Sequence, residues 1–116
     1  MMHMMDWNEY RGQVLAGVGA LGKLTPDTTR GYAMLGGAGA KTGHLDAKTR
    51  ELIAVACAIT LRCDGCITVH TKAARAEGAT EEELAEALGV AISLNAGAGL
   101  VYSTRAMDAF AASGEE

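Results

Sequence analysis

In this chain of 116 residues, the stretch 87–104 contains no charged residue, and this feature constrains the fold more than any other. A helix without a charged face is usually buried on all sides. The stretch also contains several Gly, Ser and Asn residues, so it is too polar and too interrupted for a convincing lone membrane span. A small domain has a high surface-to-volume ratio and can hardly bury such a helix alone. The sequence therefore predicts an oligomer.

The composition favours helices and excludes several classes of protein. Hydrophobic residues make up 49% of the chain and aromatic residues only 4%, which argues against intrinsic disorder and for a core of small side chains. Many Ala residues and a single Pro suit helices better than strands. The formal net charge is −4, so no basic stripe is available to bind DNA or RNA. We expect neither a nucleic acid nor a membrane as partner.

Helix caps and apolar spacing predict an all-α bundle of about six helices without a sheet. The predicted helix starts are Asp6, Thr25-Pro26, Asp46, Cys63, Thr80, and a sixth after a break at Gly97 and Gly99. The third helix covers roughly 46–61, and the fourth ends at Gly78. Residues expected to face inward include Val18 and Leu21 in the first helix, and Leu100, Val101, Met107 and Phe110 in the last.

The whole chain, 1–116, is predicted to be a single domain with its core at about 25–112. The ends, 1–5 and 113–116, are expected to be disordered. Three cysteines and no recognisable secretory segment indicate a reducing compartment, so we expect a cytoplasmic protein. Cys57, among apolar neighbours, is expected to be a buried core thiol.

Cys63 and Cys66 form a C-x-x-C motif at the predicted start of the fourth helix. The dipole and free N–H groups of that end favour thiolate over thiol. His70 follows Cys66 by four residues, so both side chains share one helix face, and His70 can take or return a thiol proton. A thioredoxin-like site would need a strand before the motif, and a helical pattern precedes it here.

Glu51 is predicted to face His70 if the third and fourth helices form an antiparallel hairpin that turns near Arg62. Glu51 lies 11 residues before that turn and His70 lies 8 after it. At ~1.5 Å per residue the two positions differ by only about 4–5 Å along the hairpin axis. A carboxylate there would set the tautomer of the imidazole.

The spacing of Glu51, Cys63, Cys66 and His70 resembles the active-site pattern of the AhpD-like alkyl hydroperoxidases, within the carboxymuconolactone decarboxylase superfamily. The segments 48–54 and 78–84 are similar to this family as well, and the resemblance covers about residues 25–112. It implies an AhpD-like helical bundle that assembles into homo-oligomers, trimers or hexamers. It also implies thiol-based reduction of hydroperoxides without flavin, haem or metal.

The resemblance further implies a role for each site residue. Cys66 would be the peroxidatic thiol, Cys63 the resolving thiol, and Glu51 with His70 the proton relay. A dithiol electron donor, lipoyl-linked or thioredoxin-like, would reopen the resulting disulfide. The best-known members place a His directly before the second Cys, whereas this chain has Gly65, which implies a shorter relay.

Two alternatives stay open from the sequence. Within the enzymes, the chain could be a disulfide reductase that serves a partner peroxidase. The second alternative, from a different class of protein, is a non-catalytic oligomeric module that binds a metal or another ligand. A zinc site would combine Cys63, Cys66 and His70 with Glu51 or His44, although this spacing is not the usual one for structural zinc.

Overall fold

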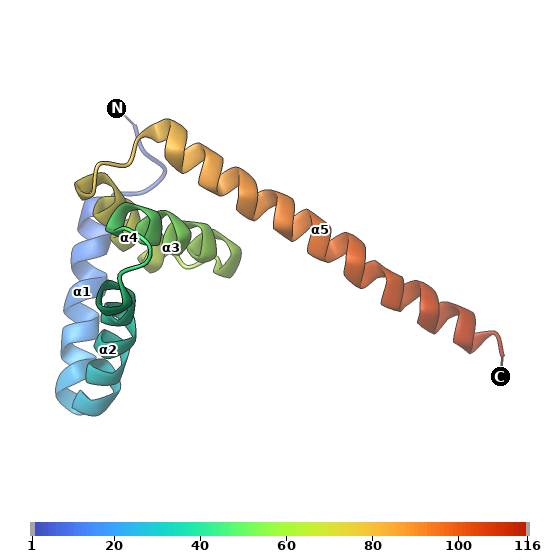
Figure 1. The fold of residues 1–116 in the computed structure, drawn as a ribbon. Helices are drawn as coiled ribbons and strands as arrows, with labels where there is room; N and C mark the ends of the chain where they lie inside the picture. Colours follow the sequence, from blue (N-terminus) through green and yellow to red (C-terminus); the bar gives the residue numbers. More distant parts are fainter. Residues whose placement is uncertain (1, 116) are drawn as a thin grey trace.

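The protein is all-helical in the computed structural model, which describes residues 2–115 (Figure 1). The elements are α1 (Trp7–Leu24), α2 (Pro26–Thr42), α3 (Ala47–Leu61), α4 (Asp64–Ala76) and α5 (Glu81–Ser113). The described residues contain no strand, which confirms the all-α prediction. The predicted number of helices was wrong, since the described part of the chain has five rather than six.

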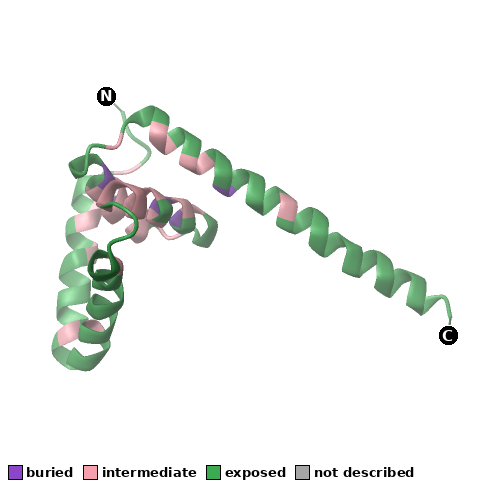
Figure 2. Ribbon diagram, viewed as in Figure 1, coloured by how far each residue is buried: buried purple, intermediate pink, exposed green. Residues whose placement is uncertain are grey.

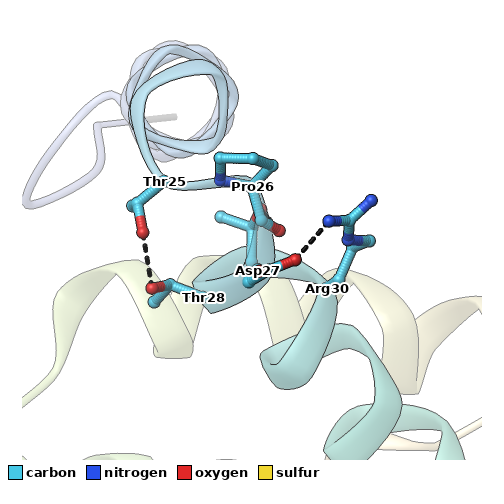
Figure 3. Close-up of polar contacts among 6 residues, drawn as sticks. Thr25, Pro26, Asp27, Thr28 and Arg30 are labelled. Atoms are coloured by element: carbon cyan, nitrogen blue, oxygen red, sulfur yellow. Dashed lines mark hydrogen bonds and ion pairs between the residues drawn. The ribbon is translucent and has the colours of Figure 1, made fainter.

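The helices α1 and α2 lie side by side and are joined by a turn at Thr25 (Figure 1). Thr25 ends α1 and precedes α2, and Pro26 occupies the first position of α2, where a missing N–H costs nothing. The hydroxyls of Thr25 and Thr28 are 2.7 Å apart, and Arg30 forms an ion pair with Asp27 in the same turn (Figure 3). The turn is therefore stabilised by local side-chain contacts.

Two glycines end helices in the left-handed conformation that other residues adopt at a cost. Gly43 follows α2 with φ of 71°, and Gly78 follows α4 with φ of 87°. The predicted end of the fourth helix at Gly78 is confirmed. The predicted third helix is also confirmed, because Asp46 caps α3 by accepting a hydrogen bond from the N–H of Thr49 at 2.8 Å.

The helix α5 is continuous over 33 residues and extends away from the other four helices (Figure 1). The break predicted at Gly97 and Gly99 is absent, so the expected sixth helix is the second half of α5. Neither glycine has a positive φ, and no Pro is present to remove a backbone hydrogen bond. A glycine inside a helix costs only about 1 kcal/mol, which the strong helix formers around it can offset.

Very little of the chain is buried (Figure 2). Among the described residues the buried ones are Val55, Ala58, Thr68, Ala74 and Ala91. The radius of gyration is 18.9 Å, whereas a compact domain of this length has one of about 13 Å. The single chain therefore lacks the core that its apolar content could form.

Several residues expected to face inward are exposed in the single chain. The exposed fractions are 44% for Val18, 51% for Leu21, 75% for Leu100 and 78% for Phe110, and Val101 and Met107 are similar. In the stretch 87–104, expected to be buried on all sides, only Ala91 is buried. These residues are exposed because of how the helices pack. The helix α5 contacts the rest of the chain only along its first half, so no other element of this chain covers its second half.

By length and composition alone, α5 could cross a membrane, and 6% of its most apolar window is buried within the chain. One such helix is weak evidence for a span, because the core helix of a protein passes the same test.

The structure does not test whether the ends of the chain are disordered. Residues 2–6 precede α1, and α5 continues through Ser113. Met1 and Glu116, which belong to the ends expected to be disordered, lie outside the described residues. The single domain over 1–116 and its disordered ends stay predictions.

Candidate functional site

The helices α3 and α4 form the hairpin that holds the candidate site. The helix α3 ends at Leu61, and Arg62 makes the turn with φ of 53°. The N–H of Arg62 bonds back to α3, and the N–H of Cys63 donates to the carbonyl of Ala58 at 3.1 Å. This tight turn brings α3 alongside α4, as the sequence predicts.

Cys63 and Cys66 are joined by a disulfide at the N-terminus of α4, with their Cα atoms 5.2 Å apart. Cys63 is the N-cap residue, and its Sγ accepts a hydrogen bond from the N–H of Cys66 at 3.1 Å. Both cysteines are half-buried. On reduction, a thiolate at Cys63 would keep this N–H donor and the positive end of the helix dipole, which both stabilise negative charge.

Glu51 and His70 meet across the hairpin. The Oε2 atom of Glu51, on α3, lies 2.7 Å from Nδ1 of His70, on α4. The exposed side-chain fractions are 26% for Glu51 and 29% for His70, so the pair is neither sealed from water nor fully hydrated. Because Nδ1 faces the carboxylate, Nε2 is the ring nitrogen left to exchange a proton. The contact predicted from the hairpin register is therefore present.

His70 lies one helical turn after Cys66, which places both residues on the same face of α4. The structure thus joins Cys63 to Cys66 at the start of α4 and brings Glu51 to His70 one helical turn further along. It does not test the chemical role that the resemblance assigns to each of them.

Gly65, between the two cysteines, lies against α1. A Cβ atom at this position would be 3.4 Å from Cγ1 of Val14. A methyl group would just fit there, whereas a longer side chain would have to displace Val14 or turn away from it. This packing contact joins residues far apart in the chain, and no sequence signal indicated it.

An ion pair fixes the start of α5 to α3. The Nζ atom of Lys48 lies 2.7 Å from Oε2 of Glu83. The hydrogen bond and charge of Lys48 lower the pKa of Glu83, and Glu83 in turn raises the pKa of Lys48. Thr80 and Glu83 form a capping box at this predicted helix start: the hydroxyl of Thr80 accepts from the N–H of Glu83 at 3.1 Å, and Oε1 of Glu83 accepts from the N–H of Thr80 at 2.9 Å.

Cys57 is exposed rather than buried, so the predicted core thiol was wrong for the single chain. It lies in an apolar groove of about 600 Å³ between α3 and α5, which we call the α3/α5 groove. The groove is lined by Thr49, Leu52, Ile53, Ala56, Cys57, Thr60, Glu83, Glu86, Ala87, Val90, Ala91 and Leu94. The sequence predicts a core around Cys57 because its neighbours are apolar, and it does not show that α5 diverges from α3.

Over residues 2–115, the structure holds no group of three or more His, Cys, Asp and Glu side chains close enough to bind a metal. The zinc set considered from the sequence, Cys63, Cys66 and His70 with Glu51 or His44, is therefore not assembled.

Tyr102 and Arg105, one turn apart on α5, contact each other: the guanidinium lies 5.2 Å from the ring centroid, in a cation–π contact.

A model of the carboxymuconolactone decarboxylase family matches residues 26–109. The chain belongs to this family. The AhpD-like proteins are part of the same superfamily. The match begins at the start of α2, so α1, with the Val14 that contacts Gly65, lies outside the matched segment.

Three similar proteins extend the comparison. An uncharacterized protein of Haemophilus influenzae is 49% identical over 105 residues, which cover 90% of this chain and 93% of that protein. An uncharacterized protein of Cupriavidus necator is 38% identical over 92 residues, covering 79% and 81%. The crystal structure of a carboxymuconolactone decarboxylase family protein from Legionella pneumophila, in its apo form, has a TM-score of 0.72 and 36% identity. It covers 90% of this chain and 93% of that one.

Proposed function

We propose that the protein is a thiol-based peroxidase of AhpD-like type, which reduces hydroperoxides through a cycle of the Cys63–Cys66 disulfide. The observation that carries the proposal is the arrangement on one hairpin. A disulfide at the N-terminus of α4 lies one turn from a histidine whose Nδ1 is held at 2.7 Å by Glu51. Family membership supports it, because AhpD-like proteins belong to the same superfamily.

In the proposed first step, the Cys66 thiolate attacks the distal oxygen of a hydroperoxide. The O–O bond breaks, Cys66 becomes a sulfenic acid, and the leaving alkoxide takes a proton from His70 to form an alcohol. In the second step, the thiol of Cys63 attacks the sulfenic sulfur, which forms the disulfide and releases water. Glu51 acts as a positioning residue, because it holds Nδ1 of the ring and leaves Nε2 to exchange the proton.

The cycle closes when a dithiol donor reduces the disulfide. A donor thiolate attacks Sγ of Cys66, and Cys63 leaves as a thiolate. The N–H of Cys66, which already contacts Sγ of Cys63 at 3.1 Å, would stabilise that leaving group. The second donor thiol then displaces Cys66, so the donor is oxidised and both cysteines are reduced. A lipoyl-linked or thioredoxin-like dithiol has the required chemistry, and a reducing compartment such as the cytoplasm would supply it.

The proposed working unit is a homo-oligomer, a trimer or a hexamer. The described chain buries only five residues, and α5 exposes large apolar side chains along its length. An aqueous monomer with this surface would leave far more apolar area in water than folded proteins usually do. Copies of the same chain would cover the α3/α5 groove and the second half of α5.

The test treats pre-reduced protein with one equivalent of an organic hydroperoxide and a sulfenic-acid trap, then maps the products by mass spectrometry. We expect Cys63→Ser to release the alcohol and to carry the trap on Cys66, and Cys66→Ser to release none. If Cys66→Ser instead releases the alcohol and carries the trap on Cys63, the two roles are reversed. Wild-type protein that releases no alcohol, yet reduces a model disulfide, would support the disulfide reductase instead.

A further inference from the structure

A second cavity lies on another side of the cysteine-bearing helix. It has a volume of about 580 Å³, is formed by α1 and α4, and we call it the α1/α4 pocket. Its lining residues are Trp7, Asn8, Arg11, Thr68, Thr71, Lys72 and Arg75. On α4, Lys72 is two residues from His70 and six from Cys66, so at 100° per residue it lies about 160° around the helix from His70 and about 120° from Cys66. The pocket is therefore separate from the proposed peroxidase site.

The lining of the α1/α4 pocket is strongly basic. Arg11, Lys72 and Arg75 contribute three positive charges, and no Asp or Glu lines it, although the whole chain has a net charge of −4. The ion pairs in residues 2–115 involve none of these three cations. Arg75 in the last turn of α4 suits the helix dipole, but the dipole of α4 does not account for Arg11 on a different helix.

A buried hydroxyl positions the cation from α1. Thr68 is 2% exposed, and its Oγ1 donates to the carbonyl oxygen of Trp7 at 3.0 Å. The same Oγ1 accepts a long hydrogen bond, 3.4 Å, from Nη1 of Arg11, whose Nη2 donates to Oδ1 of Asn8 at 2.9 Å. These contacts hold the guanidinium at the pocket wall and leave further N–H donors unused in the described contacts.

The cations on α4 complete the arrangement. Lys72 and Arg75 are three residues apart on one face of the helix, where like charges repel each other. A ligand with several oxygen atoms and a negative charge would relieve this repulsion and accept hydrogen bonds from both helices.

We propose that the α1/α4 pocket binds a small oxyanion, a phosphate or a carboxylate, between Arg11 on α1 and Lys72 and Arg75 on α4. A pocket of this volume lies in the usual range for small-molecule sites, so the anion can be one end of a larger ligand. Such a ligand would join α1, which lies outside the family match, to the helix that carries Cys66.

The experiment titrates the assembled wild-type protein with inorganic phosphate and, separately, with citrate, at an ionic strength held constant with potassium chloride. Isothermal calorimetry measures binding, and fluorescence of Trp7, the single tryptophan of the chain, reports where binding occurs. We expect saturable binding of at least one oxyanion and a saturable change in fluorescence. Binding of phosphate alone would indicate a phosphoryl ligand, and binding of citrate alone a carboxylate ligand.

Two variants locate the site. In the double variant Lys72→Gln, Arg75→Gln, affinity should fall by about tenfold or more, because hydrogen bonds to charged groups are lost. The control Lys23→Gln makes the same type of charge change at the exposed end of α1 and should leave affinity unchanged. The proposal is overturned if neither oxyanion gives a saturable signal, or if the double variant binds as tightly as the wild type. Neither result depends on the peroxidase reaction.

Discussion

Removing the charge of Glu51 tests the proposed relay where its geometry is best defined. In Glu51→Gln the side chain keeps its size, but the carboxylate that lies 2.7 Å from Nδ1 of His70 is lost. Positioned acid–base groups contribute ~10²–10⁴-fold to a rate. Both side chains are more than a quarter exposed, so water can partly replace the lost partner, and we expect the lower end of that range. A 100-fold loss corresponds to about 2.7 kcal/mol of barrier.

The assay is stopped-flow oxidation of pre-reduced protein by an organic hydroperoxide at neutral pH, for wild type, Glu51→Gln, His70→Gln and the double variant. The double variant should lose little more than either single one, because two members of one relay are not independent. Alkylation of the thiols by iodoacetamide is the control reaction. It should change less, since it needs a thiolate but no proton for a leaving oxygen. Additive losses, or an unchanged rate in Glu51→Gln, would refute the relay.

Three further predictions concern the parts around the site. Cys57→Ala should leave hydroperoxide consumption unchanged, because Cys57 lies in the α3/α5 groove rather than at the start of α4; a large loss in a folded variant would show that the wrong cysteine pair is assigned. Light scattering should find at least three chains per particle in the wild type. Val90→Glu, in the groove, should dissociate that particle, whereas Lys23→Glu should not; a wild-type monomer would contradict this. Lys48→Met should slightly lower the urea midpoint at pH 7. The ion pair requires an ionised Glu83, whose pKa Lys48 lowers, so the difference in urea midpoint between the variant and the wild type should vanish as the pH falls through that pKa. A difference that grows in acid would show that this ion pair does not stabilise the fold.

The hairpin and its contacts could be predicted from the sequence because local signals determine them. Asp46 and Thr80 are caps, and Gly78 is a helix-ending residue, each acting within a few positions of the chain. Once two helices meet at a tight turn, the rise per residue alone brings Glu51 opposite His70. Local rules were therefore sufficient for the part of the chain that carries the candidate site.

Features that depend on distant parts of the chain were predicted poorly. Cys57 has apolar neighbours and was expected in a core, but α5 diverges from α3 and leaves it exposed in the single chain. Gly97 and Gly99 suggest a break, yet neither prevents the backbone hydrogen bonds of a helix. The contact between Val14 and Gly65 joins two segments about fifty positions apart, and no periodicity in the sequence reports it.

The proposed peroxidase cycle is tested most directly by a thiol count on fully reduced protein before and after one equivalent of organic hydroperoxide per chain. We expect the number of titratable thiols to fall from three to one, since Cys63 and Cys66 form the disulfide and Cys57 stays free. We also expect one equivalent of alcohol in the same sample. Three thiols remaining after the hydroperoxide is added, with no alcohol formed, would contradict the proposed peroxidase cycle.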